Sequence, residues 1–576
     1  MVAQRFGATP QDDLTTEPDR PLDNIGEDTH LLGVDVDGAP IKSAGKGWDN
    51  LVDFEDLPWW KRPSVFWLLF PYALYTLAFG SMIVPKLNLI LNLVCQHHFA
   101  NQKLQDPRPS FDSIIIGSDN PQCKGPEVQK LAATFMLVMN LCTGMHSAFA
   151  APKIGHLSDR HGRRRLLALA CCGGLLGELI TILAATFPQT VHYRWLLLGS
   201  ILEGFTGSFT AVGLLIQSYT SDCTPPSKRA VALGYVHACV FIGFALGQFL
   251  GGEIVKLTGS LISVLYVCLV AHSVFILLVW FVVPESLSKK KQVAAQEKHH
   301  QETQQRAGHV SSSWISWARE KNPLAALSIL WPRERGTSTR LRVNLVALAA
   351  CDMIMMGSAV AASQVIILYV EYVFDWKTPE ASRFIAATSL VRVVALMGVF
   401  PVINYYFRVR PAARRRRESG FVPLDKNNGA DNVDIWILRL ALLSDVLGFV
   451  GYTVARSPAL LVASGMITAF GGLGGATNQS VVTKHVPQDR VGRVLGAFGM
   501  LQALVRVVGP VLFNSLYAAT VATYPQAIFV ALASLFSLAL ICSFLVTPFV
   551  HWEEDADQEP ESLDGRSTET FGASGL

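Results

Sequence analysis

Titratable side chains occur inside several long apolar stretches of this 576-residue sequence. Those that could bind and release a proton there are Glu178, Glu203, His237, Asp352 and Asp445. An ionisable group within a membrane-spanning segment is costly, so it commonly marks a solute path or a proton relay. We predict that one of these five residues carries a coupled proton. A structural polar pair between helices would explain each of them equally well.

A second group of polar side chains in the same stretches could contact a solute: Lys86, Gln364, Arg392, Gln479 and Arg506. For Lys86 and Arg392, an alternative is that the long side chain reaches the membrane interface. Aromatic side chains that could stack on a planar solute are Tyr72, Tyr75, Phe79, Phe205, Phe209 and Tyr219. The cysteines show no zinc spacing and the sequence has no phosphate-binding glycine loop. We therefore predict no metal and no cofactor, with a proton gradient as the driving force.

A short basic stretch separates two of the apolar segments and reads Gly155-x-Leu157-x-Asp159-Arg160-x-Gly162-Arg163-Arg164. Its two glycines permit a tight turn, and its arginines would hold that turn at the cytoplasmic surface. Asp159 is the single acid, suited to pair with the arginines or to face a helix N-terminus. The alternative is a plain basic loop that orients two helices, which explains the arginines but neither the glycines nor Asp159.

These residues must be positioned by membrane-spanning helices. A spanning helix needs about 20 predominantly apolar residues. By that measure we predict spans near 65–94, 128–151, 166–187, 195–219, 230–254, 261–283, 342–372, 380–406, 435–455, 459–482, 492–518 and 525–549. Lys and Arg concentrate in the loops that share a side when both termini are cytoplasmic, which sets the expected orientation.

Composition agrees with a membrane protein, because 50% of the residues are hydrophobic and 16% are charged, against about 25% charged in soluble domains. The net charge of +3 is too small to indicate nucleic-acid binding. We predict disordered acidic tails at 1–63 and 551–576, six-helix bundles at 64–284 and 341–550, and a cytoplasmic linker at 285–340. Cys95 and Cys123 flank the first outer loop and could form a disulfide, but sequence does not establish pairing.

The basic stretch resembles the signature loop between helices 2 and 3 of the major facilitator superfamily of secondary transporters. That resemblance implies an all-α fold of two six-helix bundles related by pseudo-two-fold symmetry, acting by alternating access as a monomer in lipid. Glycines at Gly234, Gly243, Gly247, Gly251 and Gly252 resemble the helix 5 packing motif of drug:proton antiporters, except that Gln248 replaces a proline. Ser200 stands where the drug-efflux branch usually has an arginine.

A narrower resemblance is to the proton-coupled folate transporter family, on the segments Leu512–Thr520 and Cys95–Phe99 and on Leu368-Tyr369. In that alignment His237 replaces a glutamate tied to proton coupling, and Gln479 replaces a basic residue. His titrates near neutrality and could keep the coupling, whereas the loss of the basic residue weakens folate-type anion binding.

We therefore predict a transporter of a small organic solute rather than an enzyme, proton-coupled, with a slight preference for efflux by antiport. Uptake by proton symport is the alternative, and a non-transporting membrane sensor on the same fold is a third possibility. The expected location is the plasma membrane, with a vacuolar or other internal membrane as the alternative.

Overall fold

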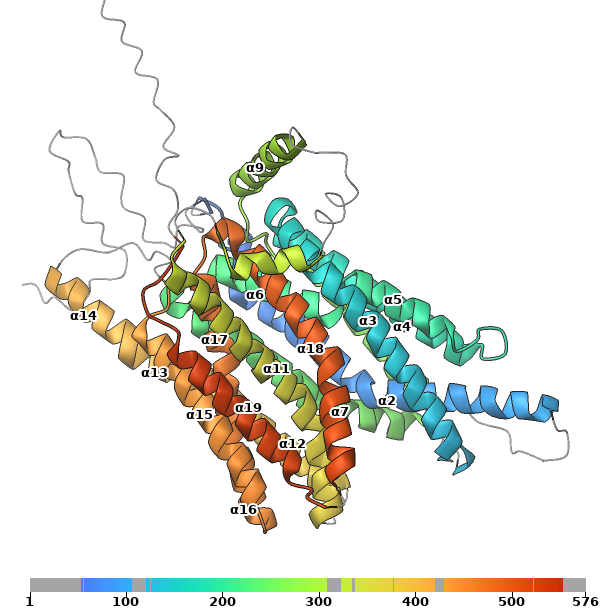
Figure 1. The fold of residues 1–576 in the computed structure, drawn as a ribbon. Coiled ribbons are helices and arrows are strands. Elements are labelled where there is room, and N and C mark those ends of the chain that lie inside the picture. Colours follow the sequence, from blue (N-terminus) through green and yellow to red (C-terminus); the bar gives the residue numbers. More distant parts are fainter. Residues whose placement is uncertain are drawn as a thin grey trace, which may run out of the picture. The chain divides into compact units, whose positions relative to one another are not determined.

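The computed structural model describes residues 53–54, 56–105, 121–124, 126–307, 323–333, 337–374, 376, 378–419, 429–521 and 523–552. The chain divides into the units Met1–Gly47 and Trp48–Leu576, and every described residue belongs to the second unit. The regular elements of this described part are all helices (Figure 1). Most of both predicted tails lies outside the described residues, as do Trp314 and Trp317 in the predicted linker.

The first half of the bundle contains α2 (Val65–Gln105), α3 (Pro126–His161), α4 (Arg163–Thr186), α5 (Trp195–Phe205), α6 (Ser208–Cys223), α7 (Pro226–Thr258) and α8 (Leu261–Phe281). Between the halves lie α9 (Lys289–Ala307) and the short helix η4 (Pro323–Leu330). The second half contains α11 (Thr339–Phe374), α12 (Thr378–Val394), α13 (Phe400–Asn404), α14 (Arg410–Ser419), α15 (Asn432–Val454), α16 (Pro458–Ala469), α17 (Gly472–Lys484), α18 (Val491–Thr520) and α19 (Ala527–Phe544).

Each predicted span coincides with one helix or with helices that follow each other directly. Within the described residues, eleven helices are long and apolar enough to cross a membrane. The segment predicted at 435–455 is not among the eleven, although it forms the 23-residue helix α15 packed between α16 and α19. Large apolar side chains point outward along the spans, as hydrocarbon contact requires; Phe70, Leu257 and Phe281 are examples.

The fourth and tenth spans are each broken near the middle. In the fourth, α5 ends at Phe205 and Gly207 adopts φ +82°, a conformation that favours glycine. The Gly207 carbonyl accepts from the Ser147 hydroxyl at 2.8 Å as well as from the Ala211 backbone N–H at 2.9 Å. In the tenth, the break lies between Ala469 and Gly472. The two breaks occupy equivalent places in the two halves, which supports the predicted internal repeat.

Two π-helical turns interrupt the eighth span, at Ala395–Val399 (η5) and Tyr405–Val409 (η6). Pro401 lies between them. Proline has no backbone N–H to donate and clashes with the preceding turn, so a local change of helix type is expected near it.

The stretch predicted as a loop at 155–165 is mostly helical, so the expectation of two turn glycines was wrong. Helix α3 continues to His161, α4 begins at Arg163, and Gly162 with φ +91° is the single residue between them. Gly155 lies inside α3, where a Cβ atom would come within 2.3 Å of the Gly492 carbonyl oxygen. Its role is therefore close packing of α3 on α18 rather than turning.

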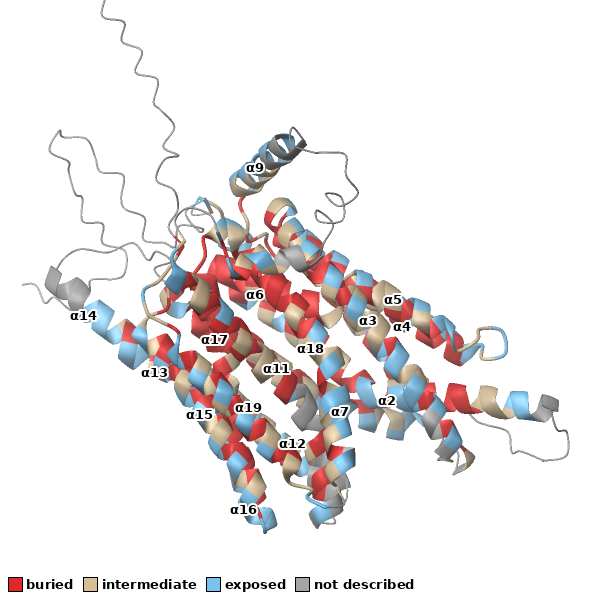
Figure 2. Ribbon diagram, viewed as in Figure 1, coloured by how far each residue is buried: buried red, intermediate tan, exposed pale blue. Residues whose placement is uncertain are grey.

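Buried residues are dense around α6 and α17 (Figure 2). This is the end of the bundle where α3, α6 and α17 finish and α4, α7 and α18 begin; we call it the basic end, after Arg163, Arg164 and Arg165. At the other end, the Cys95–Cys123 disulfide joins the last turns of α2 to the segment before α3.

Candidate substrate hollow and polar gate

A small hollow lies among α2, α4, α5, α6 and α8 in the first half. Three predicted residues, Lys86, Glu178 and Glu203, line it together with His272. Helix order positions them: Glu203 precedes the break at Gly207, and Glu178 and His272 face each other from α4 and α8. The structure thus brings together acids and a cation that are far apart in the sequence.

Glu178 and His272 form a buried pair. The Glu178 Oε1 atom lies 2.6 Å from His272 Nδ1, and the two side chains are 3% and 6% exposed. His272 Nε2 faces the Tyr75 carbonyl oxygen at 3.4 Å. Glu178 Oε2 has no hydrogen-bond partner among the described residues, although it is buried. Since both imidazole nitrogens face oxygen acceptors, the pair can hold a proton on either member.

His272 is the member of this pair that the sequence analysis missed. It stands in an apolar span, so the rule that selected the buried acids would also have selected it. Lys86 and Glu203 also line the hollow, and neither has an ion-pair or hydrogen-bond partner for its side chain within the described part of the chain. Both charges are therefore available to a solute or to a proton.

Aromatic rings of α2 and α6 line one side of the hollow, and Phe244 of α7 packs behind them. The Phe209 ring centroid lies 4.7 Å from that of Phe79, 6.0 Å from that of Tyr75 and 5.9 Å from that of Phe244. The guanidinium of Arg506, which comes from α18 in the second half, lies over the Phe209 ring at 5.2 Å. Of the other aromatic residues predicted to contact a solute, Tyr219 is buried with its hydroxyl donating to the Pro284 carbonyl, and Phe205 is 63% exposed.

The remaining candidates lie outside the hollow. His237 on α7 and Gln479 on α17 meet across the two halves, with His237 Nε2 2.8 Å from Gln479 Oε1. Asp352 accepts hydrogen bonds from Gln502 at 2.7 Å and from Asn478 at 3.5 Å, within the second half.

Asp445 lies against the Gly471 backbone at the break in the tenth span, because a Cβ atom there would come within 2.0 Å of its carboxylate. Arg392 interacts electrostatically with Asp445 and lies 5.1 Å over the Phe241 ring of α7. The side chain of Gln364 lies outside the described residues.

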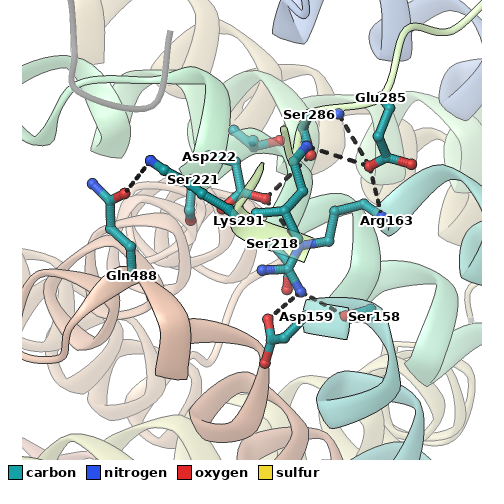
Figure 3. A network of polar contacts seen from close by, with 12 residues as sticks. Ser158, Asp159, Arg163, Ser218, Ser221, Asp222, Glu285, Ser286, Lys291 and Gln488 are labelled. Carbon is teal, nitrogen blue, oxygen red and sulfur yellow. Dashed lines mark hydrogen bonds and ion pairs between the residues drawn. The ribbon is translucent and has the colours of Figure 1, made fainter. Parts of the chain in front are cut away.

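A polar gate network closes the basic end of the first half, with Arg163 at its centre (Figure 3). Arg163 pairs with Asp159 at 2.6 Å and with Asp222, at the end of α6, at 2.9 Å. It also donates to the Ser158 hydroxyl at 2.5 Å. All of these groups are buried, so the guanidinium is neutralised by two carboxylates, as a charge away from water requires.

Glu285 covers the start of α4 from the segment after α8. Its carboxylate accepts from the backbone N–H of Arg163 at 2.7 Å and of Arg164 at 3.2 Å. An acid at this position satisfies N–H groups that have no partner inside the helix. Burial raises the pKa of Glu285, while these backbone hydrogen bonds act in the opposite direction. Asp222 and Glu285 were not predicted as site residues, since both act through contacts with residues far away in sequence.

Asp159 also contacts the second half. A Cβ atom on Gly492, the second residue of α18, would come within 2.3 Å of Asp159 Oδ1. The carboxylate therefore lies against the first turn of α18, where the helix dipole favours a negative charge. Of the other predicted residues in this stretch, Arg160 contacts His156 one turn earlier on α3, and Arg164 Nη1 donates to the Val283 carbonyl at 3.4 Å.

The second half has an equivalent network in which the charges are exchanged. Asp434, in the first turn of α15, is fully buried between Lys484, at the end of α17, and Arg408 of η6. The Lys484 Nζ atom lies 2.5 Å from Asp434 Oδ2, and Arg408 also pairs with Asp431. In the first half, the cation Arg163 begins the third span and the acid Asp222 ends the fourth. At the equivalent places of the second half, the acid Asp434 begins the ninth span and the cation Lys484 ends the tenth.

Further contacts join the halves at the basic end. Arg229 Nη1 donates to the Thr483 hydroxyl at 3.2 Å. Helix α9 reaches both halves, because Gln296 donates to the Arg160 carbonyl at 2.9 Å and Lys298 pairs with Asp489 at 2.9 Å. These contacts hold the two halves together at this end.

The predicted glycine motif packs α7 tightly on α2. A Cβ atom on Gly243, Gly247 or Gly251 would approach atoms of α2 to 2.3–2.5 Å, so each allows close backbone contact. Gly234 instead faces Phe400 of the second half. Gly252 was wrongly assigned to the motif, because a Cβ atom there would meet nothing within 4 Å among the described residues.

Comparison with known proteins identifies relatives over most of the chain. It is 27% identical to the "MFS-type transporter avaJ" of Aspergillus versicolor over 487 residues, covering 84% of this chain and 89% of the relative. It is 24% identical to the "Tetracycline resistance protein, class H" of Pasteurella multocida, covering 72% and 87%. The "Proton-coupled folate transporter" of Bos taurus is 21% identical, covering 68% and 74%.

Among solved structures, the human organic anion transporter MFSD10 superposes with a TM-score of 0.58 at 17% identity, covering 84% of this chain and all of that one. At that identity the likeness concerns the fold alone. The family model described as "Major Facilitator Superfamily" matches residues 113–419 and 432–571, which is well over half of the sequence. With its all-helical multi-pass architecture and the gate network at its basic end, the chain belongs to the major facilitator superfamily of membrane transporters.

Proposed function

We propose that this transporter exports a small organic solute in exchange for protons, and that the Glu178–His272 pair carries the coupled proton. The observation on which the proposal rests is the geometry of this pair: a buried carboxylate bonded to a buried imidazole, with one carboxylate oxygen unpartnered among the described residues, at the wall of the hollow. A proton on this pair and a solute in the hollow would compete for the same space and charge, which is the requirement for exchange.

Export is favoured by the relatives' names and by the glycine packing of α7. Relatives named as resistance or efflux proteins include the class H tetracycline protein and the "Efflux pump ustT" of Aspergillus flavus, which is 22% identical over 525 residues. Ser200 stands where the efflux branch has an arginine, so proton coupling here would use other residues. We assign that role to Glu178 and His272. Uptake by symport is the second candidate, since the chain also resembles the folate transporter and has His237 bonded to Gln479.

The proposed orientation places the basic end in the cytoplasm. Basic loops are retained on that side, and disulfides persist on the oxidising side, which fits the Cys95–Cys123 bond at the other end. In that orientation, the contacts of Asp159, Arg229 and Lys298 between structural elements make the structure closed toward the cytoplasm.

The test uses protein reconstituted in vesicles loaded with a pH-sensitive dye. A panel of anionic, neutral and cationic aromatic compounds, tetracycline among them, is first screened for flux that depends on the protein. With a transported compound, wild-type protein should accumulate it against its gradient when a pH difference is imposed, and solute movement should drive protons the opposite way. Co-movement in the same direction would establish symport instead.

The Glu178→Gln variant should still exchange external solute for internal solute across the vesicle membrane. It should no longer accumulate solute against its gradient or move protons. Glu253→Gln is the matched control, since Glu253 pairs with Lys256 on an exposed helix end and should retain both activities. Accumulation by Glu178→Gln equal to that of the control would exclude this pair as the coupling site. Glu203→Gln, Asp352→Asn, Asp445→Asn and His237→Gln then test the remaining predicted groups.

A further inference from the structure

Arg506 is a cation whose surroundings lack an acid. Its guanidinium lies over the Phe209 ring, and the tyrosines within its electrostatic range are Tyr72 and Tyr75. The Nε atom is buried without a hydrogen-bond partner, and the guanidinium has no ion pair among the described residues. In contrast, Arg163 and Arg408 are each neutralised by two aspartates.

Arg506 is partly exposed as a residue, but it stands within a membrane-spanning helix, where a cation without a counter-charge is unfavourable unless something completes its coordination. The planar guanidinium presents parallel N–H donors that match a carboxylate in a two-point contact. Arg506 is also oriented by the aromatic ring beneath it, which leaves the edge of the guanidinium free to donate. The group that best completes this site is therefore an anionic carboxylate.

The wall beside Arg506 favours an aromatic solute. Phe79, Tyr75 and Phe244 surround Phe209 at ring distances of 4.7–6.0 Å, so their faces and edges offer stacking positions to a planar ring. Lys86 lines the hollow itself and has no side-chain partner in the described part, whereas Arg506 reaches the hollow only through its place over the Phe209 ring.

We propose that the transported solute is an aromatic carboxylate, with its ring against the Phe209 cluster and its carboxylate on Arg506. The inference rests on the proposed function, because it names the class of solute for the same hollow. Phe209 comes from α6 and Arg506 from α18, so the solute contacts both halves at once. A ligand that bridges the halves can bias their relative position, as alternating access requires.

The alternative is a cationic amine held by Glu203, the unpaired acid of the hollow, and the test separates the two. The probes are naphthoate, its methyl ester and naphthylmethylamine, which share one ring system and differ in charge. Binding is measured by the thermal stability of the purified protein, and transport by flux into vesicles. Naphthoate should stabilise and be transported, whereas the ester and the amine should do neither at the same concentration.

Arg506→Gln should weaken naphthoate binding by roughly 10- to 100-fold, the range expected for losing a charge-assisted hydrogen bond. Arg506→Lys keeps the charge but not the two-point geometry and should lose less. Arg439→Gln is the matched control, because Arg439 also lies over aromatic rings, at 4.3 Å from Phe544 and 5.6 Å from Trp436, but not over the Phe209 ring that lines the hollow. It should bind naphthoate as the wild type does.

Failure of this inference differs from failure of the proposed function. Preference of the wild type for the amine or the ester, or equal naphthoate affinity of Arg506→Gln and Arg439→Gln, would overturn the aromatic carboxylate while leaving proton exchange intact. Naphthoate flux that depends on Arg506 but not on the pH difference would overturn proton exchange while leaving the aromatic carboxylate as the solute. If Arg506→Gln does not fold, the acid-to-ester comparison in the wild type and the Arg506→Lys variant still decide.

Discussion

Asp159 interacts with two partners at once, which makes it sensitive to substitution. It pairs with Arg163 in its own half and lies against the first turn of α18 in the other half. We expect Asp159→Asn to keep the shape of the contact and lose its charge, which is worth about 0.3–2 kcal/mol at a helix N-terminus. The closed state of the basic end should then become less populated, and flux under a proton gradient should fall while expression stays near normal.

Asp56→Asn is the control, because Asp56 is exposed and outside the bundle interface. The closed fraction can be followed by labelling a cysteine placed at the basic end. Unchanged flux and labelling in Asp159→Asn would show that the carboxylate's charge has no part in the gate.

His485 predicts an acid-sensitive contact just after α17. Its Nδ1 donates to the Val481 carbonyl at 2.7 Å, so the neutral ring's Nε2 accepts from Asn344 at 3.0 Å. Asn344 in turn accepts from the backbone of Thr547 after α19. Burial lowers the pKa of His485 to about 4, whereas an unfolded histidine has a pKa of about 6.5.

The unfolded chain therefore binds this proton first, so stability from His485 is complete above about pH 6.5 and is lost as the pH falls toward 4. The full loss is roughly 3 kcal/mol at 1.36 kcal/mol per pKa unit. In a purified sample, the Tm of His485→Gln should be lower at neutral pH but depend less on pH across this range than that of the wild type. A His551→Gln control should keep the wild-type slope, and parallel curves for all three proteins would refute the assignment.

Helix α9 forms a strap, that is, a helix that contacts elements of both halves at the basic end. Its Gln296 contacts α3, and its Lys298 pairs with Asp489 just before α18. The ion pair itself is half exposed and is worth at most about 1 kcal/mol, so removing it should change transport little. Fixing it covalently should matter more, because opening the basic end requires the halves to separate there.

Joining Lys298→Cys and Asp489→Cys with a reducible bifunctional thiol reagent, whose length replaces that of the lysine side chain, should stop transport, and a reducing agent should restore it. The control crosslink joins Thr258→Cys and Ser263→Cys, whose hydroxyls lie 2.6 Å apart within one half, and it should leave transport unchanged. Full transport with a complete crosslink at 298 and 489 would mean that the strap does not take part in opening.

The helices were largely predictable, because each span is a long apolar run bounded by Pro, Gly or charged residues. The breaks within spans were not predictable: Thr206-Gly207 and Phe470-Gly471 lie in apolar runs, and glycine within a membrane helix is also used for packing. Partners were the least predictable feature. Arg163 and Asp222 are 59 residues apart, and Lys484 and Asp434 are 50 apart, so only the folded chain brings each pair together.

The two halves of the molecule share equivalent positions but carry charges of opposite sign in their gate networks. Pro226 begins α7 and Pro487 precedes α18, so a proline stands at the entry to equivalent helices of the two halves. The gate networks near these positions use Arg163 between acids in one half and Asp434 between bases in the other. Equivalent places in the two halves therefore carry opposite charges. This arrangement avoids repulsion between like charges when the halves approach each other at the basic end.

The orientation of the whole molecule gives the last prediction. Thr190 is exposed between α4 and α5 at the disulfide end, where the His192 ring lies 4.1 Å from the His97 ring of α2, and Ala294 is exposed on α9 at the basic end. In a background whose free cysteines are replaced, an impermeant thiol reagent added outside intact cells should label Thr190→Cys at once. It should label Ala294→Cys only after the membrane is permeabilised, because positive loops stay in the cytoplasm. Labelling of Ala294→Cys in intact cells, with Thr190→Cys protected, would invert the orientation, and the proposed direction of proton exchange would invert with it.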